Sequence, residues 1–399
     1  MRILFISTLY PVKSGHYSSE VITHALHNFV REWSKHNEVR VIRPLITNIN
    51  PLKPFHYYPK HIVSPGEYVL DSINISAVPV YRIPKTEILL TQKLERSIRD
   101  SDFRPDVIIA HFGRSIIIGA KMAKKTNLPF ICGIHITDIN HLKVENHFKQ
   151  VLLNSIASSV ACACRAPHIL NSFSNMNISK PEIIFPAYSG ISPSLITKNF
   201  YNTPKYTDLF NSENVIISTA STLIKRKNID IILQALALLD CNWEFHIAGD
   251  GKESESLRNL ASVHKISDKV VFHGLLSHTE TLKIMSSSHL FVLPSANETF
   301  GTVYLEAMAT GNIVIGSKGC GIDGIIHNGI NGYLVTPGSI KELSETLEEI
   351  LFKSSREKLQ TILRASFGTV SGMTSEEMAK KYLSSVQKAI KANKSSKDL

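Results

Sequence analysis

Two glutamates stand eight positions apart in a segment that could bind a polar ligand. Glu298 and Glu306 lie in PSANETFGTVYLE (294–306), which follows an apolar run at 290–293. We predict that a strand ends at Pro294, that a loop carries Glu298, and that a helix then runs to about Gly311, because glycine is typical just after a helix. Glu306 would lie about one and a half turns into that helix.

Both carboxylates are therefore expected at the carboxyl end of a strand, beside a helix N-terminus. Backbone N–H groups and the helix dipole favour an anion such as a phosphate at such a place. An ionised carboxylate can also accept two hydrogen bonds from a vicinal diol. Without further context the simpler alternative is that Glu298 caps the helix and Glu306 is a solvated helical residue.

Other polar residues also follow apolar runs directly. His111 ends the run 106–111, and His135 and Asp138 come after the run 129–134. Gly15 lies in the first loop, where glycine suits either a tight turn or a close approach of the backbone to a ligand. Satisfied core histidines remain the alternative for His111 and His135, and a plain turn for Gly15.

These residues need a scaffold whose strands end on one edge. Short apolar runs alternate with helix-period segments from residue 2, and the alternation restarts after residue 214. Buried parallel strands covered by helices on both faces give this pattern. We predict an α/β protein with two doubly wound domains, 1–193 and 215–375, a polar linker 194–214 and a basic helical tail 376–399. Ligands of such sheets bind outside the carboxyl ends of the strands.

The segment from Glu298 to Glu306 resembles the Glu-x7-Glu signature of retaining GT-B glycosyltransferases, the large family related to glycogen and sucrose synthases. The resemblance covers roughly residues 215–345 and includes AGDG (248–251), VVFHG (270–274), GIDGII (321–326) and NGINGYLV (328–335). It is looser in the N-terminal half, where the Gly15 loop, HFG (111–113) and HITD (135–138) carry it. It implies two Rossmann-like domains that face each other across a cleft.

The resemblance also implies a site for a nucleotide-diphosphate sugar. Glu306 would hold the ribose hydroxyls, and Glu298 would contact the donor sugar. Lys227, in STLIKRKN (221–228), would neutralise the leaving diphosphate, where charge builds as the glycosidic bond breaks. The family's arginine falls on Thr222, so Lys225 or Arg226 would replace it. The other residues expected at the donor are Gly15, Gly249, Gly251, Phe300, Gly301, Thr302 and Val303.

The N-terminal half would complete the reaction centre. By the same resemblance His135 would donate to the donor sugar or its phosphate, and Asp138 would orient that histidine or face the acceptor. His111 and Gly15 would lie on the acceptor side. Two departures from the family pattern occur here, because Ser14 takes the place of one glycine and Ile136 takes the place of another.

Composition excludes several classes of protein. The chain has 399 residues, 43% of them apolar and 20% charged, as in ordinary globular proteins. We find no signal-peptide pattern at the N-terminus, and the uncharged stretch 150–164 is too short to span a membrane. Five cysteines do not suggest a disulfide framework, so Cys162 and Cys164 are expected to be core thiols. No zinc spacing or nucleotide-binding glycine motif occurs, and Asp100-Ser-Asp102 is poorly placed for a metal, so neither a metal nor a cofactor is expected.

Positive charge is concentrated in one half of the chain. Of the net charge of +10, residues 1–195 hold 22 basic and 13 acidic residues, whereas residues 196–399 hold 22 and 21. Such an excess indicates partners rather than fold, and here it fits an anionic membrane face or a phosphorylated substrate. Nucleic acid is not expected, since no basic stretch has interleaved aromatic residues. Residues 114–125, with Lys121, Lys124 and Lys125, are a candidate membrane-facing helix unless their apolar side packs on the sheet.

We therefore predict a retaining glycosyltransferase that uses a nucleotide-diphosphate sugar, with UDP favoured over GDP, and a glycan or polyprenyl-linked acceptor. The GIDGII variant resembles bacterial enzymes of cell-surface polysaccharide assembly, which suggests a cytoplasmic protein with an option of peripheral attachment to the inner membrane face. Two alternatives stay open. One is a sugar-nucleotide epimerase of the same architecture, and the other is a non-catalytic protein that binds nucleotide sugars.

Overall fold

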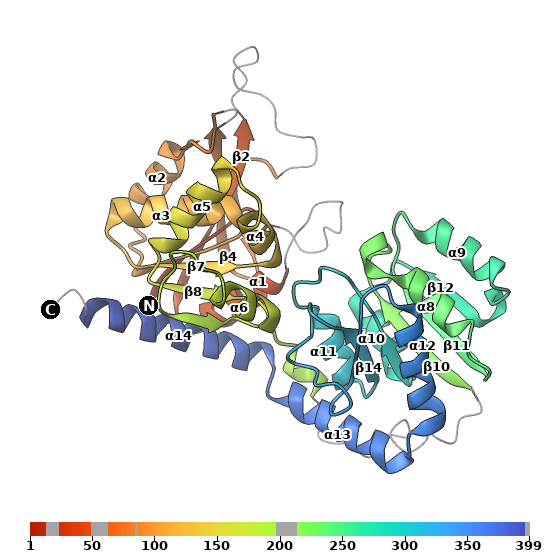
Figure 1. Ribbon diagram of the computed structural model, residues 1–399. Helices are drawn as coiled ribbons and strands as arrows, with labels where there is room; N and C mark the ends of the chain where they lie inside the picture. The colour runs from red at the N-terminus through yellow and green to blue at the C-terminus, as the bar shows by residue number, and fades with distance from the viewer. Residues whose placement is uncertain (13–23, 49–62, 84–85, 197–213, 396–399) are drawn as a thin grey trace. The chain divides into compact units, whose positions relative to one another are not determined.

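A computed structural model describes residues 1–12, 24–48, 63–83, 86–196 and 214–395. The chain divides into two compact units, each built on its own sheet (Figure 1). Unit 1 comprises Met1–Ser189 together with Ser375–Leu399, and unit 2 comprises Gly190–Thr374. Most of the linker predicted at 194–214 falls on 197–213, which lie outside the described residues. Residues 376–399, predicted from the sequence as a separate basic tail, are grouped with unit 1.

The sheet of unit 1 has the strand order β3-β4-β2-β1-β6-β7-β8-β9, with β5 paired to β4. Its neighbours are parallel except where β4 meets β3 and β5. Every residue of β6, β7 and β8 is buried, as expected for parallel strands covered on both faces. The strands are β1 Arg2–Ser7, β2 Glu38–Asn48, β3 Gly66–Leu70, β4 Ile73–Arg82, β5 Leu89–Leu90, β6 Val107–His111, β7 Phe130–Ile134, β8 Ala161–Cys164 and β9 Ile184–Pro186.

Helices of unit 1 include one from the far end of the sequence. α14 packs against α1, and the indole Nε1 of Trp33 donates to the carbonyl of Ala379 at 3.0 Å. α3 packs on β6, β7 and α5. The helices are α1 His24–Ser34, α2 Gln92–Arg99, α3 Gly113–Thr126, α4 Ile136–Leu142, α5 His147–Ala157, α6 Pro167–Ser174 and α14 Ser375–Ser395.

The apolar side of α3, considered above for membrane contact, lies in the core. Ile116, Ile117, Ile118 and Met122 are all buried. The Nζ of Lys121 donates to the carbonyl of Leu89, and Lys125 pairs with Glu95, whereas Lys124 is exposed. The alternative that the apolar side packs on the sheet is therefore correct. No helix among the described residues is long and apolar enough to cross a membrane.

Unit 2 has a parallel sheet with the order β12-β11-β10-β13-β14-β15. Its strands are β10 Val215–Ala220, β11 Trp243–Ala248, β12 Val270–Gly274, β13 Leu290–Val292, β14 Ile313–Ser317 and β15 Tyr333–Val335. Its α-helices are α8 Ile229–Leu236, α9 Ser254–Val263, α10 His278–Ser287, α11 Thr302–Ala309, α12 Ile340–Glu348 and α13 Arg356–Ser371. Short helical turns are η1 Pro193–Leu195, η3 Lys225–Lys227 and η4 Ser267–Lys269, and η5 Glu349–Lys353 is a π-helix.

Among the parallel strands of each sheet, the strand order reverses at one point. In unit 1 the reversal lies between β1 and β6, and in unit 2 it lies between β10 and β13. Crevices for ligands form outside the carboxyl ends of the strands at such points. Two doubly wound units are thus confirmed, and each has a defined edge at which a ligand should bind.

Candidate functional site

In unit 2 two loops meet at the reversal of strand order. The loop after β10 leads into η3, and the loop after β13 carries the first glutamate of the motif. The backbone N–H of Ala296 donates to the carbonyl of Arg226 at 2.7 Å, and Asn228 Nδ2 donates to the carbonyl of Pro294 at 2.7 Å. These bonds hold the two loops together.

Lys227 and Glu298 form a largely buried ion pair at this junction. Lys227 Nζ lies 2.5 Å from Glu298 Oε2, and the side chains are 11% and 15% exposed. Arg226 Nη1 lies 3.5 Å from the same oxygen. Burial by itself would raise the pKa of Glu298, but the charge and hydrogen bond of Lys227, assisted by Arg226, outweigh it and hold that pKa below its usual value. The junction thus carries two cations and one ionised carboxylate.

The second glutamate, Glu306, has a partner that the sequence did not suggest. It lies in the second turn of α11, and its Oε1 accepts a hydrogen bond from His278 Nε2 at 3.0 Å. That hydrogen bond raises the pKa of His278, although burial acts against it. His278 begins α10, 28 positions before its partner, so no local pattern could have linked the two.

The backbone around the glutamates depends on glycine. Gly301 precedes α11 with φ +77°, and a Cβ there would come within 2.5 Å of the Tyr304 ring. Glycine is favoured at such a positive φ. Thr302 and Val303 form the first turn of α11, whose N–H groups have no intrahelical partners. Phe300 is buried beside them.

Gly249 and Gly251 lie where the backbone after β11 approaches the loop after β10. A Cβ on Gly249 would come within 1.9 Å of the Ser221 carbonyl oxygen, and one on Gly251 within 2.4 Å of the Leu223 carbonyl oxygen. The structure therefore brings Gly249, Gly251, Gly301, Lys227, Glu298 and Glu306 to one edge of unit 2, and their role at a donor stays a prediction. Gly15 and Ser14 lie outside the described residues.

In unit 1 His111, His135 and Asp138 form one hydrogen-bonded group. His111 Nδ1 lies 3.0 Å from His135 Nε2, and His111 Nε2 lies 2.8 Å from the hydroxyl of Tyr382, which α14 supplies. Asp138 accepts hydrogen bonds from the backbone N–H groups of His135 and Gly113, each at 2.8 Å. Both nitrogens of His111 therefore have partners within unit 1.

Burial controls the charge of this group. It lowers the pKa of His111 and of His135 well below the usual value, and the nearby positive charge of Arg165 acts in the same direction. Burial also raises the pKa of Asp138 to about 6, although its two N–H partners oppose the shift. At neutral pH both histidines are neutral and Asp138 is largely ionised.

Gly133 was not singled out in the sequence, yet it makes room for His111. A Cβ at Gly133 would lie 2.0 Å from the imidazole ring of His111. A glycine inside an apolar strand signals a close approach of this kind, but it does not name the neighbour.

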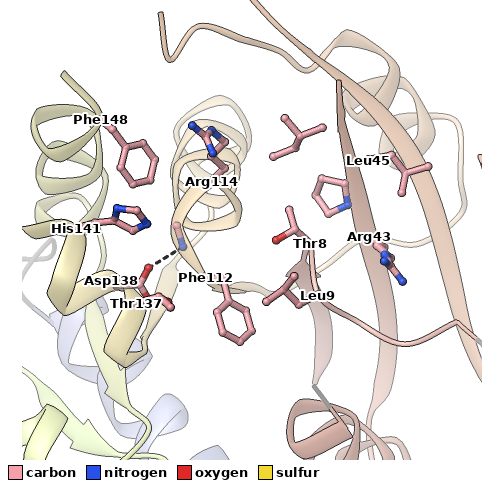
Figure 2. Close-up of a pocket in the computed structure, with 13 residues that line it drawn as sticks. Thr8, Leu9, Arg43, Leu45, Phe112, Arg114, Thr137, Asp138, His141 and Phe148 are labelled. Carbon is pink, nitrogen blue, oxygen red and sulfur yellow. Dashed lines mark hydrogen bonds between the residues drawn. The ribbon is translucent and has the colours of Figure 1, made fainter. Parts of the chain in front are cut away.

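A pocket of about 430 Å³ opens beside Asp138 at the reversal of strand order in unit 1 (Figure 2). Side chains from α4 and α5 form one wall, and residues of β2 with those following β1 form the opposite wall. The lining residues are Thr8, Leu9, Arg43, Pro44, Leu45, Ile46, Phe112, Gly113, Arg114, Thr137, Asp138, His141 and Phe148. His111, the described residue predicted for the acceptor side, ends β6 at this edge of the sheet and does not line the pocket.

Among the described residues no group of three or more His, Cys, Asp or Glu side chains is arranged to hold a metal ion. The five cysteines are free thiols, and Cys162 and Cys164 are fully buried, which confirms that they are core residues.

Known proteins are similar to this chain in sequence and in fold. Residues 205–365 match the family described as Glycosyl transferases group 1. An uncharacterized glycosyltransferase of Methanocaldococcus jannaschii is 26% identical over 283 residues, which cover 69% of this chain and 71% of the relative. N-acetyl-alpha-D-glucosaminyl L-malate synthase of Bacillus anthracis is 24% identical over 285 residues, with 70% and 73% covered.

The protein also resembles Anabaena Alr3699/HepE, whose crystal structure was solved in complex with UDP and glucose. The TM-score is 0.68 at 17% sequence identity, with 97% of this chain and 100% of that chain covered. A likeness at this level of identity concerns the fold. It confirms the predicted GT-B fold with two Rossmann-like domains.

Proposed function

We propose that this chain is a retaining glycosyltransferase that uses a nucleotide-diphosphate sugar. The match of residues 205–365 to Glycosyl transferases group 1 and the GT-B fold support the proposal. The observation that carries this proposal is the Lys227–Glu298 pair beside the N-terminus of α11, at the reversal of strand order in unit 2. Cations and helix N–H groups suit a diphosphate, and carboxylates suit the hydroxyls on either side of it.

Each candidate donor-site residue of unit 2 has a proposed role. Lys227 and Arg226 face the diphosphate, and Arg226 supplies the cation that the family's arginine would supply at Thr222. Glu298 contacts the donor sugar, and Glu306 holds the ribose. The amides of Thr302 and Val303 face the phosphates, while Gly249, Gly251, Phe300 and Gly301 shape the site. UDP is the proposed nucleotide, a choice supported by the structural relative that was solved with UDP.

Retention follows if the acceptor hydroxyl attacks from the face that the diphosphate leaves. The acceptor oxygen then bonds to the anomeric carbon, the bond from that carbon to the diphosphate breaks, and a diphosphate oxygen takes the hydroxyl proton. Lys227 and Arg226 stabilise the charge that builds on the leaving group. We assign His135 to the donor sugar, Asp138 to holding His135, and His111 with Gly15 to the acceptor side.

The proposed acceptor is a glycan or a polyprenyl-linked glycan of cell-surface polysaccharide assembly, used in the cytoplasm. Attachment to an anionic membrane face would be peripheral and electrostatic, because the apolar side of α3 is buried. Each exposed lysine near such a surface contributes about 1 kcal/mol. Lys124→Glu should therefore weaken binding to anionic vesicles at low salt. Equal binding to anionic and neutral vesicles would contradict the attachment.

Binding of the donor can be tested without knowledge of the acceptor. A panel of UDP-, GDP- and ADP-sugars should include one that stabilises the protein in thermal unfolding, by about 2.7 kcal/mol at a 100-fold excess over Kd. The shift should shrink in Lys227→Gln and persist in Lys124→Gln, which removes one charge elsewhere. No shift with any nucleotide sugar would contradict the proposal. An epimerase of the same architecture would also bind, but it would change a ring carbon of the sugar.

A further inference from the structure

The pocket in unit 1 has an arginine in its wall that is oriented for binding. Arg114, the second residue of α3, lines the pocket and is partly exposed. Its Nε and Nη2 donate to the two carboxylate oxygens of Glu87, each at 2.8 Å. A guanidinium has five N–H donors, so this bidentate pairing fixes the plane of the group and leaves three donors for a ligand.

Glu87 holds a second arginine as well. Arg82 Nη1 lies 2.9 Å from Glu87 Oε1, and the carboxylate is only 8% exposed. Burial by itself would raise the pKa of Glu87, but the bonds and charges of Arg114 and Arg82 outweigh it and hold that pKa below its usual value. The three side chains thus comprise two cations and one anion, and Arg114 is the one of them that lines the pocket.

Aromatic and apolar side chains complete the surroundings of Arg114. Its guanidinium carbon lies 5.0 Å from the centre of the Phe148 ring, and Figure 2 shows the two groups side by side. His141 stands edge-on to the same ring, with the centroids 4.9 Å apart. Leu45 and Phe112 line the pocket as well. A ligand that carries an anionic group beside apolar carbon surface matches these walls.

Asp138 is the one carboxylate among the described residues that line the pocket, and the two guanidinium groups of Arg43 and Arg114 outnumber its negative charge. Both oxygens of Asp138 accept backbone hydrogen bonds and the side chain is buried. Arg43, a second guanidinium of the lining, donates through Nη1 to the carbonyl of Tyr10 at 2.8 Å. The pocket therefore favours an anion over a cation.

We propose that this pocket binds the acceptor through a phosphate or carboxylate group that Arg114 contacts, so that the substrate receiving the sugar is acidic. The inference rests on the proposed function, because it concerns the second substrate of the same reaction. A planar, preorganised guanidinium recognises phosphate and carboxylate better than a flexible ammonium does. The anionic group can belong to a free metabolite or to a lipid headgroup.

Isothermal titration of the full chain tests the proposal with four probes. Glycerol 3-phosphate and malate represent free acids, vesicles that contain phosphatidic acid represent headgroups, and glycerol is the neutral control. Arg114→Gln should weaken binding of at least one acidic probe tenfold or more. The matched control is Arg82→Gln. Arg82 pairs with the same carboxylate, Glu87, but does not line the pocket, so its loss should change the Kd of the acidic probes less than threefold. Arg114→Lys, which keeps the charge, should fall between wild type and Arg114→Gln.

Three results would overturn the inference. They are wild-type affinity in Arg114→Gln, equal affinity for glycerol and glycerol 3-phosphate, and no binding of any acidic probe at about 10 mM. Lys227→Gln separates this outcome from failure of the donor assignment. Acidic probes that bind Arg114→Gln but not Lys227→Gln would occupy the donor site, which would overturn the pocket and leave the proposed function standing.

Discussion

At the scale of single residues, the buried pair of Lys227 and Glu298 is central to the proposed function. Removing one partner of a buried pair leaves an uncompensated charge and costs about 3–5 kcal/mol, here at the lower end because Arg226 remains nearby. We predict that Lys227→Met destabilises unit 2 by about 3 kcal/mol and slows transfer about 10²-fold or more. Urea unfolding followed by the fluorescence of Trp243, in β11, would measure the first effect.

The double variant separates stability from catalysis. Lys227→Met with Glu298→Gln removes both charges, so it should recover most of the stability and none of the transfer rate. A double variant that transfers sugar at the wild-type rate would contradict the catalytic role of the pair.

Glu306 should act on the nucleotide rather than on the chemical step. Glu306→Gln is expected to weaken binding of the nucleotide by roughly 1–3 kcal/mol, the range for lost charge-assisted hydrogen bonds. Glu298→Gln should instead lower turnover far more than nucleotide affinity. Calorimetric titration with UDP and steady-state kinetics give both quantities for each variant. Unchanged nucleotide affinity in Glu306→Gln would remove it from the site.

Asp138 should give unit 1 an unusual dependence on pH. Its folded pKa of about 6 is above the usual 3.8, so its stabilising contribution is fully present below pH 3.8 and is lost as the pH rises through 6. At 1.36 kcal/mol per pKa unit the loss approaches about 3 kcal/mol. Asp138→Asn cannot titrate, so the stability of wild type minus that of the variant should fall between pH 4 and pH 7.

Each unit has its own tryptophan, which makes that experiment practical. In a Trp243→Phe background, Trp33 in α1 alone reports the unfolding of unit 1. A difference in stability that stays constant with pH would show that Asp138 is ionised at its ordinary pKa.

At the scale of elements, α14 contributes one side chain, Tyr382, to the candidate reaction centre of unit 1. Its Tyr382 is fully buried and bonds to His111 at 2.8 Å. Tyr382→Phe leaves a buried imidazole nitrogen without its partner, which costs about 1–3 kcal/mol. We predict that it also lowers turnover at unchanged nucleotide affinity, because the orientation of His135 depends on His111.

Tyr10→Phe is the matched control for that prediction. Tyr10 is also buried and its hydroxyl lies 2.9 Å from a histidine nitrogen, that of His27. The two variants should lose similar stability, and only Tyr382→Phe should lose turnover. Equal turnover in both variants would make the link to α14 structural alone.

Local patterns predicted the elements but not all of their partners. Apolar runs and helical periods identified β1, β6, β10 and β11 because burial on both faces leaves a continuous signal. The antiparallel pair β3–β4 was not predicted. β3 is a short strand at the sheet edge, and the apolar run of β4 is interrupted by Asn74, Ser76 and Pro79. The packing of α14 on unit 1 was not predicted either, because the amphipathic pattern of a helix shows which face is buried but not which unit buries it.

The same difference between local pattern and distant partner holds for the candidate sites. The spacing from Glu298 to Glu306 placed both glutamates correctly at a strand end and in a helix. Their partners, His278 and Lys227, lie 28 and 71 positions away along the chain, so a fold is needed to bring them together. The pairing of Glu87 with Arg114 across 27 positions has the same origin.

At the scale of the molecule, the chain leaves unit 1 after Ser189 and returns to it at Ser375. Within unit 2 the two connections begin side by side, since the backbone N–H of Ile191 donates to the carbonyl of Met373 at 3.0 Å. Unit 2 contains the proposed donor site, and unit 1 contains the pocket that we propose for an acidic acceptor. The greater positive charge of the N-terminal half agrees with an acidic substrate there.

The most direct test of the central claim is proton NMR of the sugar that the protein releases from its nucleotide donor. The donor is the nucleotide sugar that gives the largest thermal shift, and water serves as the acceptor. We predict that the first sugar to appear has the anomeric configuration of the donor, and that Lys227→Met slows its release about 10²-fold or more. A first-formed sugar of inverted configuration, or equal release by wild type and Lys227→Met, would contradict a retaining glycosyltransferase with its donor site at Lys227 and Glu298.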